Sequence, residues 1–316
     1  SNGNSWVTNN RCEKGEVVGD PRDAAVNRAL KEKQSQTASV PDLFDLRAKL
    51  LFRQYDFPAP KTDRGLTIGL PRVLAFWDTM PFWNTFWRAL GYRVRISDRS
   101  SRELYENGLS AVTSDTVCFP AKLVHGHIRN LAKHGVDRIF MPSVTTVPTE
   151  NGEETSESMC AVVKGYPIVI RNSDDPEKRW GIPFDAPLFH WYTKEDRNRQ
   201  LSHYMEETFG VLEEETLAAI GAGDAAQETF ERVLKRGGEA VLDMVRREGK
   251  FAVVLASRPY QNDVLVSHDL PKLFTRAGIP VLTADSLPEV NETDLKKSRL
   301  DIVNNFHARM LSSAIL

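Results

Sequence analysis

The sequence predicts an α/β fold of two Rossmann-like parallel-sheet units that are linked by a helical segment. Strand-like and helix-like segments alternate from residue 66 onwards, which is typical of a parallel sheet flanked by helices. The same alternation returns after residue 251, behind a stretch with helical periodicity and few strand signals. At 316 residues the chain is long enough for two compact domains.

The N-terminal part, residues 1–63, is predicted to be a polar extension with helices. Pro21 fits the first turn of a solvated helix over 21–36, and the spacing of leucines predicts an amphipathic helix over 43–55. The prolines of FPAPK break that pattern, which predicts a linker near 57–63.

The first α/β unit is predicted to span residues 64–191. Its expected strands are LTIGL (66–70), YRVRIS (92–97) and DRIFMPSV (137–144), and its expected helices cover FWDTMPFWNTFWRALG (76–91), 101–108 and 119–134. Aromatic residues recur with helical spacing in the first of these helices, which indicates packing in the core rather than a stacking platform.

Residues 192–250 are predicted to form the helical bridge, and 251–316 the second α/β unit. In the second unit, two strand-like runs, FAVVLASRPY and IPVLTAD, enclose the helical pattern of VSHDLPKLFTRAG. The final segment, 293–316, is helical in pattern and becomes apolar where the sequence stops, without a Gly or Asn cap. We therefore expect the chain to be a fragment that is truncated at this helix.

Composition and charge exclude several classes of function. The formal net charge is -2, so no global basic field would attract nucleic acid or an anionic membrane. No apolar run reaches the roughly 18 to 20 residues of a membrane span, and no secretory signal pattern is present, so a cytoplasmic location is expected. The cysteines, Cys12, Cys118 and Cys160, are too few for a disulfide framework and favour reduced thiols or metal ligation.

The stretch SDTVCFPAKLVHGHI, residues 114–128, carries the strongest chemical signal. Pro120 in the first turn of the predicted helix places Cys118 at the positive end of the helix dipole, where a thiolate is stabilised. Lys122 and His125 follow at helical spacing and share the face of Cys118. Such a thiol is suited to metal ligation or nucleophilic attack. Spacing leaves open the alternative of a small buried cysteine with solvated histidines.

Cys160 follows the acidic stretch NGEETSESM and precedes AVVKGYPIVIRNS. Because loops after parallel strands meet at one edge of a sheet, we expect Cys118 and Cys160 to converge on a shared pocket there. Met141, Pro142 and Ser143, at the end of the third strand, are expected to project to the same edge.

Arg72 and Arg258 follow predicted strands, in the motifs GLPR and SRPYQND. A guanidinium at the carboxyl end of a strand can bind phosphate or carboxylate through several donors, although a salt bridge is the commoner fate of a lone arginine. Arg72 and Arg258 are therefore candidate cofactor-binding residues, together with Lys122 and His125. No phosphate-binding glycine loop, H-E-x-x-H or paired C-x-x-C occurs, so the sequence does not support nucleotide hydrolysis, dinucleotide redox chemistry or a closed zinc knuckle.

Four stretches together resemble consecutive motifs of one family. They are GLPRVLAFWDTMPFWNTFWRALGYRVRISDRSSRELYENGL, SDTVCFPAKLVHGHIRNLAKHGVDRIFMPS, MCAVVKGYPIVIRNS and SRPYQND. The family comprises the activator-like relatives of (R)-2-hydroxyglutaryl-CoA dehydratase, known as CoA-substrate-specific enzyme activases. In such fusion proteins, ATPase repeats come first, a segment similar to this chain follows, and a region similar to the dehydratase subunits comes last.

The resemblance implies that cysteines of this region hold an iron–sulfur cluster and that ATP drives electrons to a low potential for acyl-CoA dehydration. Cys118 and Cys160 match two expected ligand positions, whereas Ser143 stands where the family commonly has a cysteine. A cluster normally takes three or four thiolates, so His125, Lys122 or a cysteine of a partner region would have to complete it. ATP is expected to bind only in a part of the parent protein outside this sequence, and acyl-CoA is a candidate partner.

The preferred hypothesis is an internal domain of an acyl-CoA dehydratase activase-type protein of anaerobic metabolism, which supports an iron–sulfur site or docks the other parts during ATP-driven electron transfer. A second hypothesis is a scaffold without a cluster between the ATPase and dehydratase-like parts, which Ser143 favours. A third is a zinc site of Cys118, Cys160 and a histidine, because zinc accepts mixed nitrogen and sulfur ligands. Alone, the chain is expected to be inactive.

Overall fold

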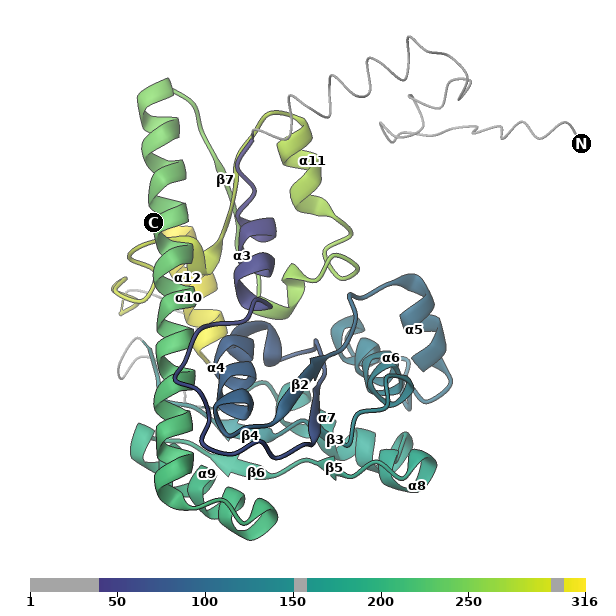
Figure 1. Ribbon diagram of the computed structural model, residues 1–316. Coiled ribbons are helices and arrows are strands. Elements are labelled where there is room, and N and C mark those ends of the chain that lie inside the picture. The colour runs from purple at the N-terminus through teal and green to yellow at the C-terminus, as the bar shows by residue number, and fades with distance from the viewer. Residues whose placement is uncertain (1–39, 151–157, 297–303) are drawn as a thin grey trace, which may run out of the picture.

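A computed structural model of the chain describes residues 40–150, 158–296 and 304–316. Cys12 and the helix predicted over 21–36 lie outside the described residues. Within the described part, helices surround three sheets whose strands all pair in parallel (Figure 1). This arrangement confirms the predicted α/β fold with parallel-sheet units.

The main sheet has the strand order β2-β1-β3-β5. Its strands are β1 (Thr67–Leu70), β2 (Arg93–Ile96), β3 (Arg138–Phe140) and β5 (Phe184–Asp185). The chain leaves β1 to form β2 on one side of it, and then crosses back to form β3 on the other side. This reversal is a topological switch point, the place where α/β proteins commonly bind ligands beside the carboxyl ends of the strands.

The prediction of a single strand over 137–144 is wrong, because two strands form there, separated by Met141 and Pro142. β3 ends at Phe140, and β4 (Ser143–Thr146) pairs instead with β6 (Leu188–His190) in a second sheet. Proline has no N–H to donate to a strand ladder, which explains the interruption.

Three helices form where the sequence predicts them in the first α/β unit, and α5 packs against α6. They are α4 (Phe76–Ala89), α5 (Arg102–Leu109) and α6 (Phe119–Lys133). Most of α4 is buried, and Trp87 packs edge-on against Phe140 of β3 with ring centroids 5.0 Å apart. The aromatic run is therefore part of the core, as its spacing predicts. Two further helices, α7 (Ala161–Ser173) and α8 (Pro176–Trp180), were not among the predicted elements.

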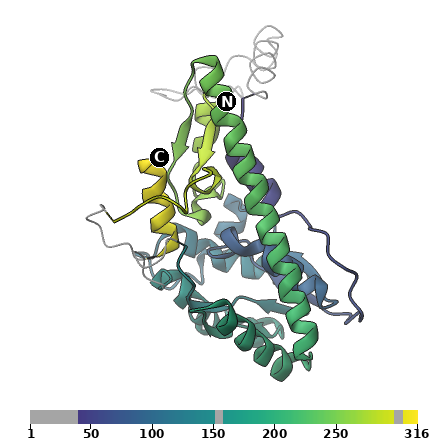
Figure 2. The ribbon, with the colours of Figure 1, turned by 90° about the vertical axis from the view of Figure 1, so that its left-hand side faces the viewer.

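The helical pattern between the units corresponds to α9 (Lys194–Phe209) and α10 (Glu213–Glu248). α10 runs beside both parts of the molecule (Figure 2), in contact with α4 at one end and with α3 (Leu43–Leu51) and the 3-10 turn η3 (Ala284–Ser286) towards the other. Gly238 allows this approach, because a Cβ atom there would lie 1.9 Å from the carbonyl oxygen of Ser286.

The second parallel pair consists of β7 (Val253–Leu255) and β8 (Val281–Thr283), with the 3-10 turn η2 (Pro259–Asn262), α11 (Leu270–Arg276) and α12 (Asn305–Ile315) around it. The helix predicted over 43–55 is α3, which ends earlier, at Leu51, and lies beside β8. Part of the helical pattern predicted over 293–316 lies outside the described residues, and the described part contains α12.

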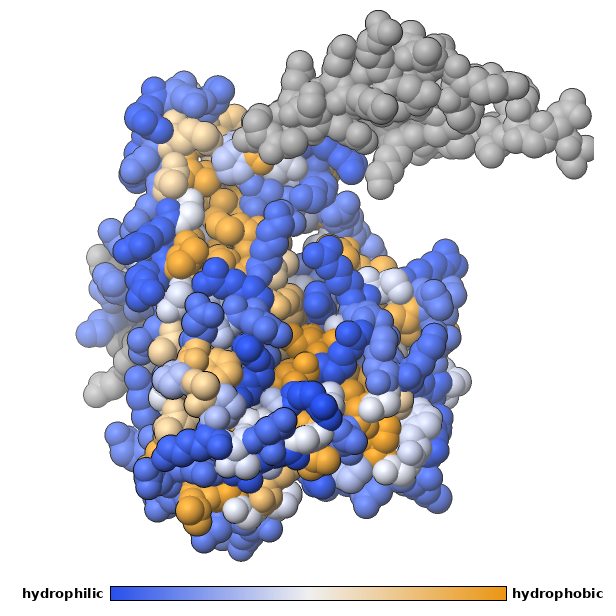
Figure 3. All heavy atoms as spheres, viewed as in Figure 1, coloured by the Kyte–Doolittle hydropathy of each residue, from blue (hydrophilic) through white to orange (hydrophobic). Residues whose placement is uncertain are grey.

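The face seen in Figure 1 is largely polar, with apolar side chains visible between the lobe of α3 and α10 and the lobe of α5 and α6 (Figure 3). One continuous cluster of buried apolar residues extends from α3 and α4 through the main sheet to α10 and α12. Among the described residues, no helix combines the length and the apolar character that crossing a membrane requires.

Candidate functional site

Cys118 is the N-cap residue of α6, at the helix N-terminus that the sequence predicts, and its side chain is exposed. The thiol makes no capping hydrogen bond, so it is free for other chemistry. The backbone N–H groups of Ala121 and Lys122 turn back to the Cys118 carbonyl oxygen, at 3.0 and 3.3 Å. A helix N-terminus favours negatively charged groups. The alternative of a small buried cysteine, which the spacing left open, is therefore wrong for Cys118.

Cys160 occupies the same position on α7. It is the N-cap residue, its side chain is half-buried, and it too makes no capping hydrogen bond. Each of two helices that pack against each other, α6 and α7, therefore begins with an uncommitted thiol.

Both cysteines act on the phenol of Tyr260, in the turn η2. Burial raises the pKa of Tyr260, the hydrogen bond and charge of Arg258 lower it, and the charges of Cys160 and Cys118 raise it further. Pro120, in the first turn of α6, and Tyr260 line one small cavity, so the start of α6 lies beside this turn. The set of Cys118, Cys160, Arg258 and Tyr260 is here named the thiol site.

Arg258 is the cation of the thiol site. Its Nη1 donates to the Tyr260 hydroxyl at 3.2 Å, and its Nη2 lies 2.7 Å from Nε2 of His307 on α12. Burial and, to a smaller extent, the charge of Arg258 lower the pKa of His307. The neutral ring, whose Nε2 can accept a hydrogen bond from the guanidinium, is therefore favoured. In the part of the chain that the structure describes, no carboxylate forms an ion pair with Arg258.

Lys122 and His125 do not join the thiols directly. Nζ of Lys122 donates to the carbonyl oxygen of Asp115 at 2.8 Å. His125 is fully buried, with Nδ1 2.7 Å from Oδ2 of Asp174 and Nε2 3.1 Å from the hydroxyl of Tyr166. The alternative of solvated histidines is therefore wrong for His125.

His125 instead supports Tyr166 of α7, the helix that Cys160 begins. Its hydrogen bond holds the hydroxyl of Tyr166 on α7. Burial raises the pKa of Tyr166 to about 12, and the charges of Cys118 and then Asp174 contribute to the rise. Tyr166 thus remains a neutral hydroxyl at neutral pH. Sequence reasoning missed Tyr166, because no local signal connects it to a histidine on another helix.

The other histidine of the motif, His127, is buried as well, between the hydroxyls of Ser97 and Ser100. Ser100 in turn donates to a carboxylate oxygen of Asp263, just beyond η2. Burial and the charge of Arg72 lower the pKa of His127 to about 3, against a smaller opposing effect of Asp98. His127 is therefore a neutral structural group that joins α6 to the loop after β7.

Ser143, the residue at the expected third cysteine position, is buried at the start of β4. Its hydroxyl donates to the carbonyl oxygen of Lys164 in the first turns of α7. The position thus lies against the helix that Cys160 begins. Within the described residues, no group of three or more His, Cys, Asp or Glu side chains is arranged to hold a metal ion.

Arg72 lies beside the thiol site rather than in a salt bridge. It lines a small cavity together with Pro120 and Tyr260, and its guanidinium carbon lies 3.7 Å from the centre of the Phe52 ring. Nε is buried without a hydrogen-bond partner, and no carboxylate within the described ranges pairs with the guanidinium. Burial, followed by the charge of Arg99, lowers the pKa of Arg72 to about 10.

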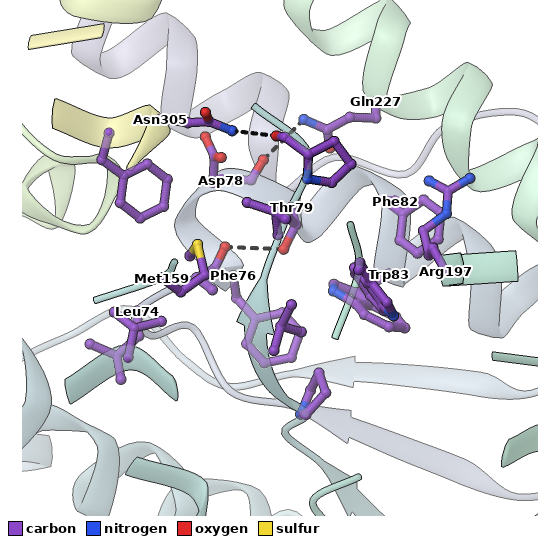
Figure 4. A pocket seen from close by; sticks show the side chains of 18 of the residues that line it. Leu74, Phe76, Asp78, Thr79, Phe82, Trp83, Met159, Arg197, Gln227 and Asn305 are labelled. Carbon is purple, nitrogen blue, oxygen red and sulfur yellow. Dashed lines mark hydrogen bonds between the residues drawn. The ribbon is translucent and has the colours of Figure 1, made fainter. Parts of the chain in front are cut away.

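A separate cavity of about 300 Å³ lies at the carboxyl ends of β1 and β3 (Figure 4). Met141 and Pro142 line it, at the sheet edge to which the sequence assigns them. Met159 also lines it, although neither Cys118 nor Cys160 does. The walls that α10 and α12 contribute could not be anticipated from the sequence.

Comparison with known proteins agrees with the activase resemblance at the level of the domain. Residues 67–287, more than half of the chain, match the family described as "CoA enzyme activase uncharacterised domain". No curated protein and no solved structure matches the chain significantly.

Proposed function

Because the chain belongs to the CoA enzyme activase domain family, we propose that it is an internal domain of an activase-type protein, in which Cys118 and Cys160 supply two thiolate ligands to an iron–sulfur cluster. The cluster would take part in ATP-driven electron transfer to 2-hydroxyacyl-CoA dehydratase-like chemistry. ATP binding belongs to the ATPase part of the parent protein, and a cytoplasmic location accompanies this role.

The observation that carries the proposal is that two helices in contact, α6 and α7, each begin with an uncommitted thiol. Thiolate-bound clusters are anionic, and helix N-termini favour anions. Arg258 adds a positive charge that no carboxylate of the described residues neutralises. Hydrogen-bond donors near cluster sulfurs tune the reduction potential, and the hydroxyl of Tyr260, which accepts from Arg258 and keeps its own proton, is a donor at hand.

Two thiolates do not complete a cluster, which normally takes three or four. His125 is committed to Asp174 and Tyr166, and Lys122 to a carbonyl oxygen. The remaining ligands would therefore come from the ATPase or dehydratase-like regions of the parent protein. The chain is then one half of a shared site rather than a self-contained iron–sulfur protein.

Anaerobic reconstitution tests the proposal. The chain is treated with iron and sulfide, and iron, sulfide and zinc contents are measured together with the visible spectrum. We expect a brown protein whose iron content and absorbance fall in Cys118→Ser and in Cys160→Ser. Ser143→Ala is the control, because its hydroxyl already donates to the Lys164 carbonyl oxygen, and it should retain iron.

The other outcomes distinguish the rival functions. Iron content that is the same in the double cysteine variant and in the unchanged chain would refute ligation by these thiols. Stoichiometric zinc that depends on both cysteines would instead establish a zinc site. Because Ser143 replaces the expected third thiol, the scaffold function remains the second candidate, and it predicts neither metal but stable binding to the separately produced ATPase and dehydratase-like regions.

A further inference from the structure

The strand β7 has one free edge, because within the described residues it pairs with β8 alone. Figure 1 shows β7 near the carboxyl end of α10, away from the main sheet. The N–H of Val253 donates to the carbonyl oxygen of Pro280, just before β8, at 2.9 Å. Since successive residues of a strand direct their backbone groups to opposite sides, Val254 points its N–H and C=O away from β8. These groups are available to a further strand.

The sequence of β7 is that of an interior strand. Residues 251–256, FAVVLA, are all apolar, and such unbroken runs are typical of parallel strands that are buried on both faces. The edge strand of the main sheet is different. β2 alternates apolar residues with Arg93 and Arg95, and charged side chains keep an edge from pairing with other strands. β7 thus combines the composition of an interior strand with the position of an edge strand.

The burial of the second parallel pair differs between its two strands. Val281 and Leu282 of β8 are fully buried, whereas all three residues of β7 are half-buried. Phe251, which leads into β7, is 65% exposed. Among the described elements, β7 packs chiefly against β8. An apolar strand with an open edge tends to pair with another strand, so we expect a partner to cover it.

The strand order of the main sheet indicates where a further neighbour of β7 belongs. There, β2 forms on one side of β1 and β3 on the other, so the first strand lies in the middle. β7 and β8 repeat the first step of this order. The far edge of β8 is already occupied, because the N–H of Val281 donates to the carbonyl oxygen of Pro41 at 3.1 Å and Asp42 bridges to Val281. A third strand therefore joins this sheet at β7.

We propose that the free edge of β7 is a docking site for one further parallel strand, which the dehydratase-like region of the parent protein supplies. The docked strand is an extended, apolar segment rich in β-branched residues, and its backbone pairs with Val254. α12 then precedes this strand as α6 precedes β3. The proposal rests on the proposed role as an internal domain, but it is independent of any metal at the thiol site.

Hydrogen exchange measured by mass spectrometry tests the docking site, in the isolated chain and in the full-length parent protein, both without metal. Electron-transfer fragmentation resolves the amides of Val253 and Val254, two valines that differ in the side to which they point. In the isolated chain, we expect Val254 to exchange at least about tenfold faster than Val253, whose N–H is already bonded. In the parent protein, Val254 should be protected to the level of Val253.

Three results would overturn the proposal. One is equal exchange of Val254 in the isolated chain and in the parent protein. Another is protection in the isolated chain that increases with its concentration, which would show that copies of the chain pair with each other. The third is protection in the isolated chain at any concentration, which would show that a segment of the chain itself covers β7. Since no metal is present, a failure of iron binding at the thiol site leaves all of these results unchanged.

Two proline variants test the backbone pairing directly. Val254→Pro removes an N–H on the free edge, so the isolated chain should tolerate it better than Leu255→Pro, which removes a donor on the β8 side. In the parent protein, both variants should lower the midpoint of urea denaturation to a similar extent. A parent protein that tolerates Val254→Pro as well as the isolated chain does would contradict the pairing. If either variant fails to fold, the exchange rates of the unchanged proteins still decide.

Discussion

Arg309 of α12 holds Asp78 of α4 by two parallel hydrogen bonds, with Nη1–Oδ1 and Nη2–Oδ2 distances of 2.8 and 3.0 Å. The same guanidinium also donates to both carboxylate oxygens of Glu150. Burial alone would lower the pKa of Arg309, but Asp78 and Glu150 raise it well above its ordinary value. One cation therefore fixes the last described helix against the first α/β unit.

We expect Arg309→Met to lower the free energy of unfolding by about 1 to 3 kcal/mol, because Asp78 loses its closest cation and keeps only Arg47, 3.7 Å away, while Glu150 loses both of its hydrogen bonds to the guanidinium. Urea denaturation followed by circular dichroism measures the change. Arg102→Met is the matched control: it breaks an ion pair with Glu106 that is open to solvent on both sides, and it should have no measurable effect. Equal stabilities of the two variants would show that the Arg309 pairs contribute nothing net.

A second prediction concerns the close crossing of α5 and α6. A Cβ atom at Gly126 would lie 2.2 Å from the carbonyl oxygen of Leu104, so Gly126→Ala forces two helix backbones apart. We expect a loss of about 1 to 3 kcal/mol in the free energy of unfolding. Gly165 is also inside a helix, but nothing lies within 4 Å of its added Cβ atom. Gly165→Ala should therefore raise the free energy of unfolding by about 0.5 to 1 kcal/mol. The prediction holds if the changes in unfolding free energy of the two variants have opposite signs.

A third prediction follows from the pKa of about 3 for His127. The folded state holds this ring neutral, whereas the unfolded chain protonates it below its ordinary pKa of 6.5. The stabilisation is thus complete above pH 6.5 and is lost as the pH falls from 6.5 towards 3, by up to about 1.4 kcal/mol per pH unit.

His127→Gln removes the titration and keeps hydrogen-bonding capacity towards Ser97 and Ser100. We expect the difference in unfolding free energy between the unchanged chain and this variant to shrink between pH 6.5 and pH 4.5, as measured by urea denaturation at several pH values. His203→Gln, on the exposed face of α9, should leave the pH dependence as it was. A constant difference across this range would contradict a neutral buried ring.

Local patterns in the sequence predict much of the scaffold. The aromatic spacing of α4 and the Cys-Phe-Pro start of α6 are properties of short segments, and both elements form where these signals lie. α7 carries weaker signals, because AVVKGYPIVIRNS contains a glycine, a proline and several β-branched residues that disfavour a helix. It forms nevertheless, since Val163, Tyr166 and Ile170 recur at helical spacing and are buried.

The chemistry around the site depends on partners that are distant in the sequence. His125 is buried because Asp174, 49 residues later, accepts from it. Arg72 stacks its guanidinium on Phe52, 20 residues earlier, and forms no ion pair within the described part of the chain. The cavity at the carboxyl ends of β1 and β3 needs α12 to close one wall, with Arg309 held by Asp78, 231 residues earlier. No periodicity within a short window encodes these contacts, so sequence reasoning identifies the cysteines but not their surroundings.

The last prediction concerns the reactivity of the two thiols. Cys118 is exposed, whereas Cys160 is half-buried. Both cysteines begin a helix, and neither makes a capping hydrogen bond. Thiol alkylation depends on access as well as on the charge state, so iodoacetamide should modify Cys118 several-fold faster than Cys160 in the folded chain. Peptide mass spectrometry over a time course measures both rates, and the urea-unfolded chain, in which the rates should converge, is the control.

Anaerobic loading with iron and sulfide should then slow both reactions together, because ligation occupies both sulfur atoms at once. Protection of Cys118 alone would mean that the thiols do not share one metal centre, and a faster reaction at Cys160 would contradict the exposures on which the argument depends.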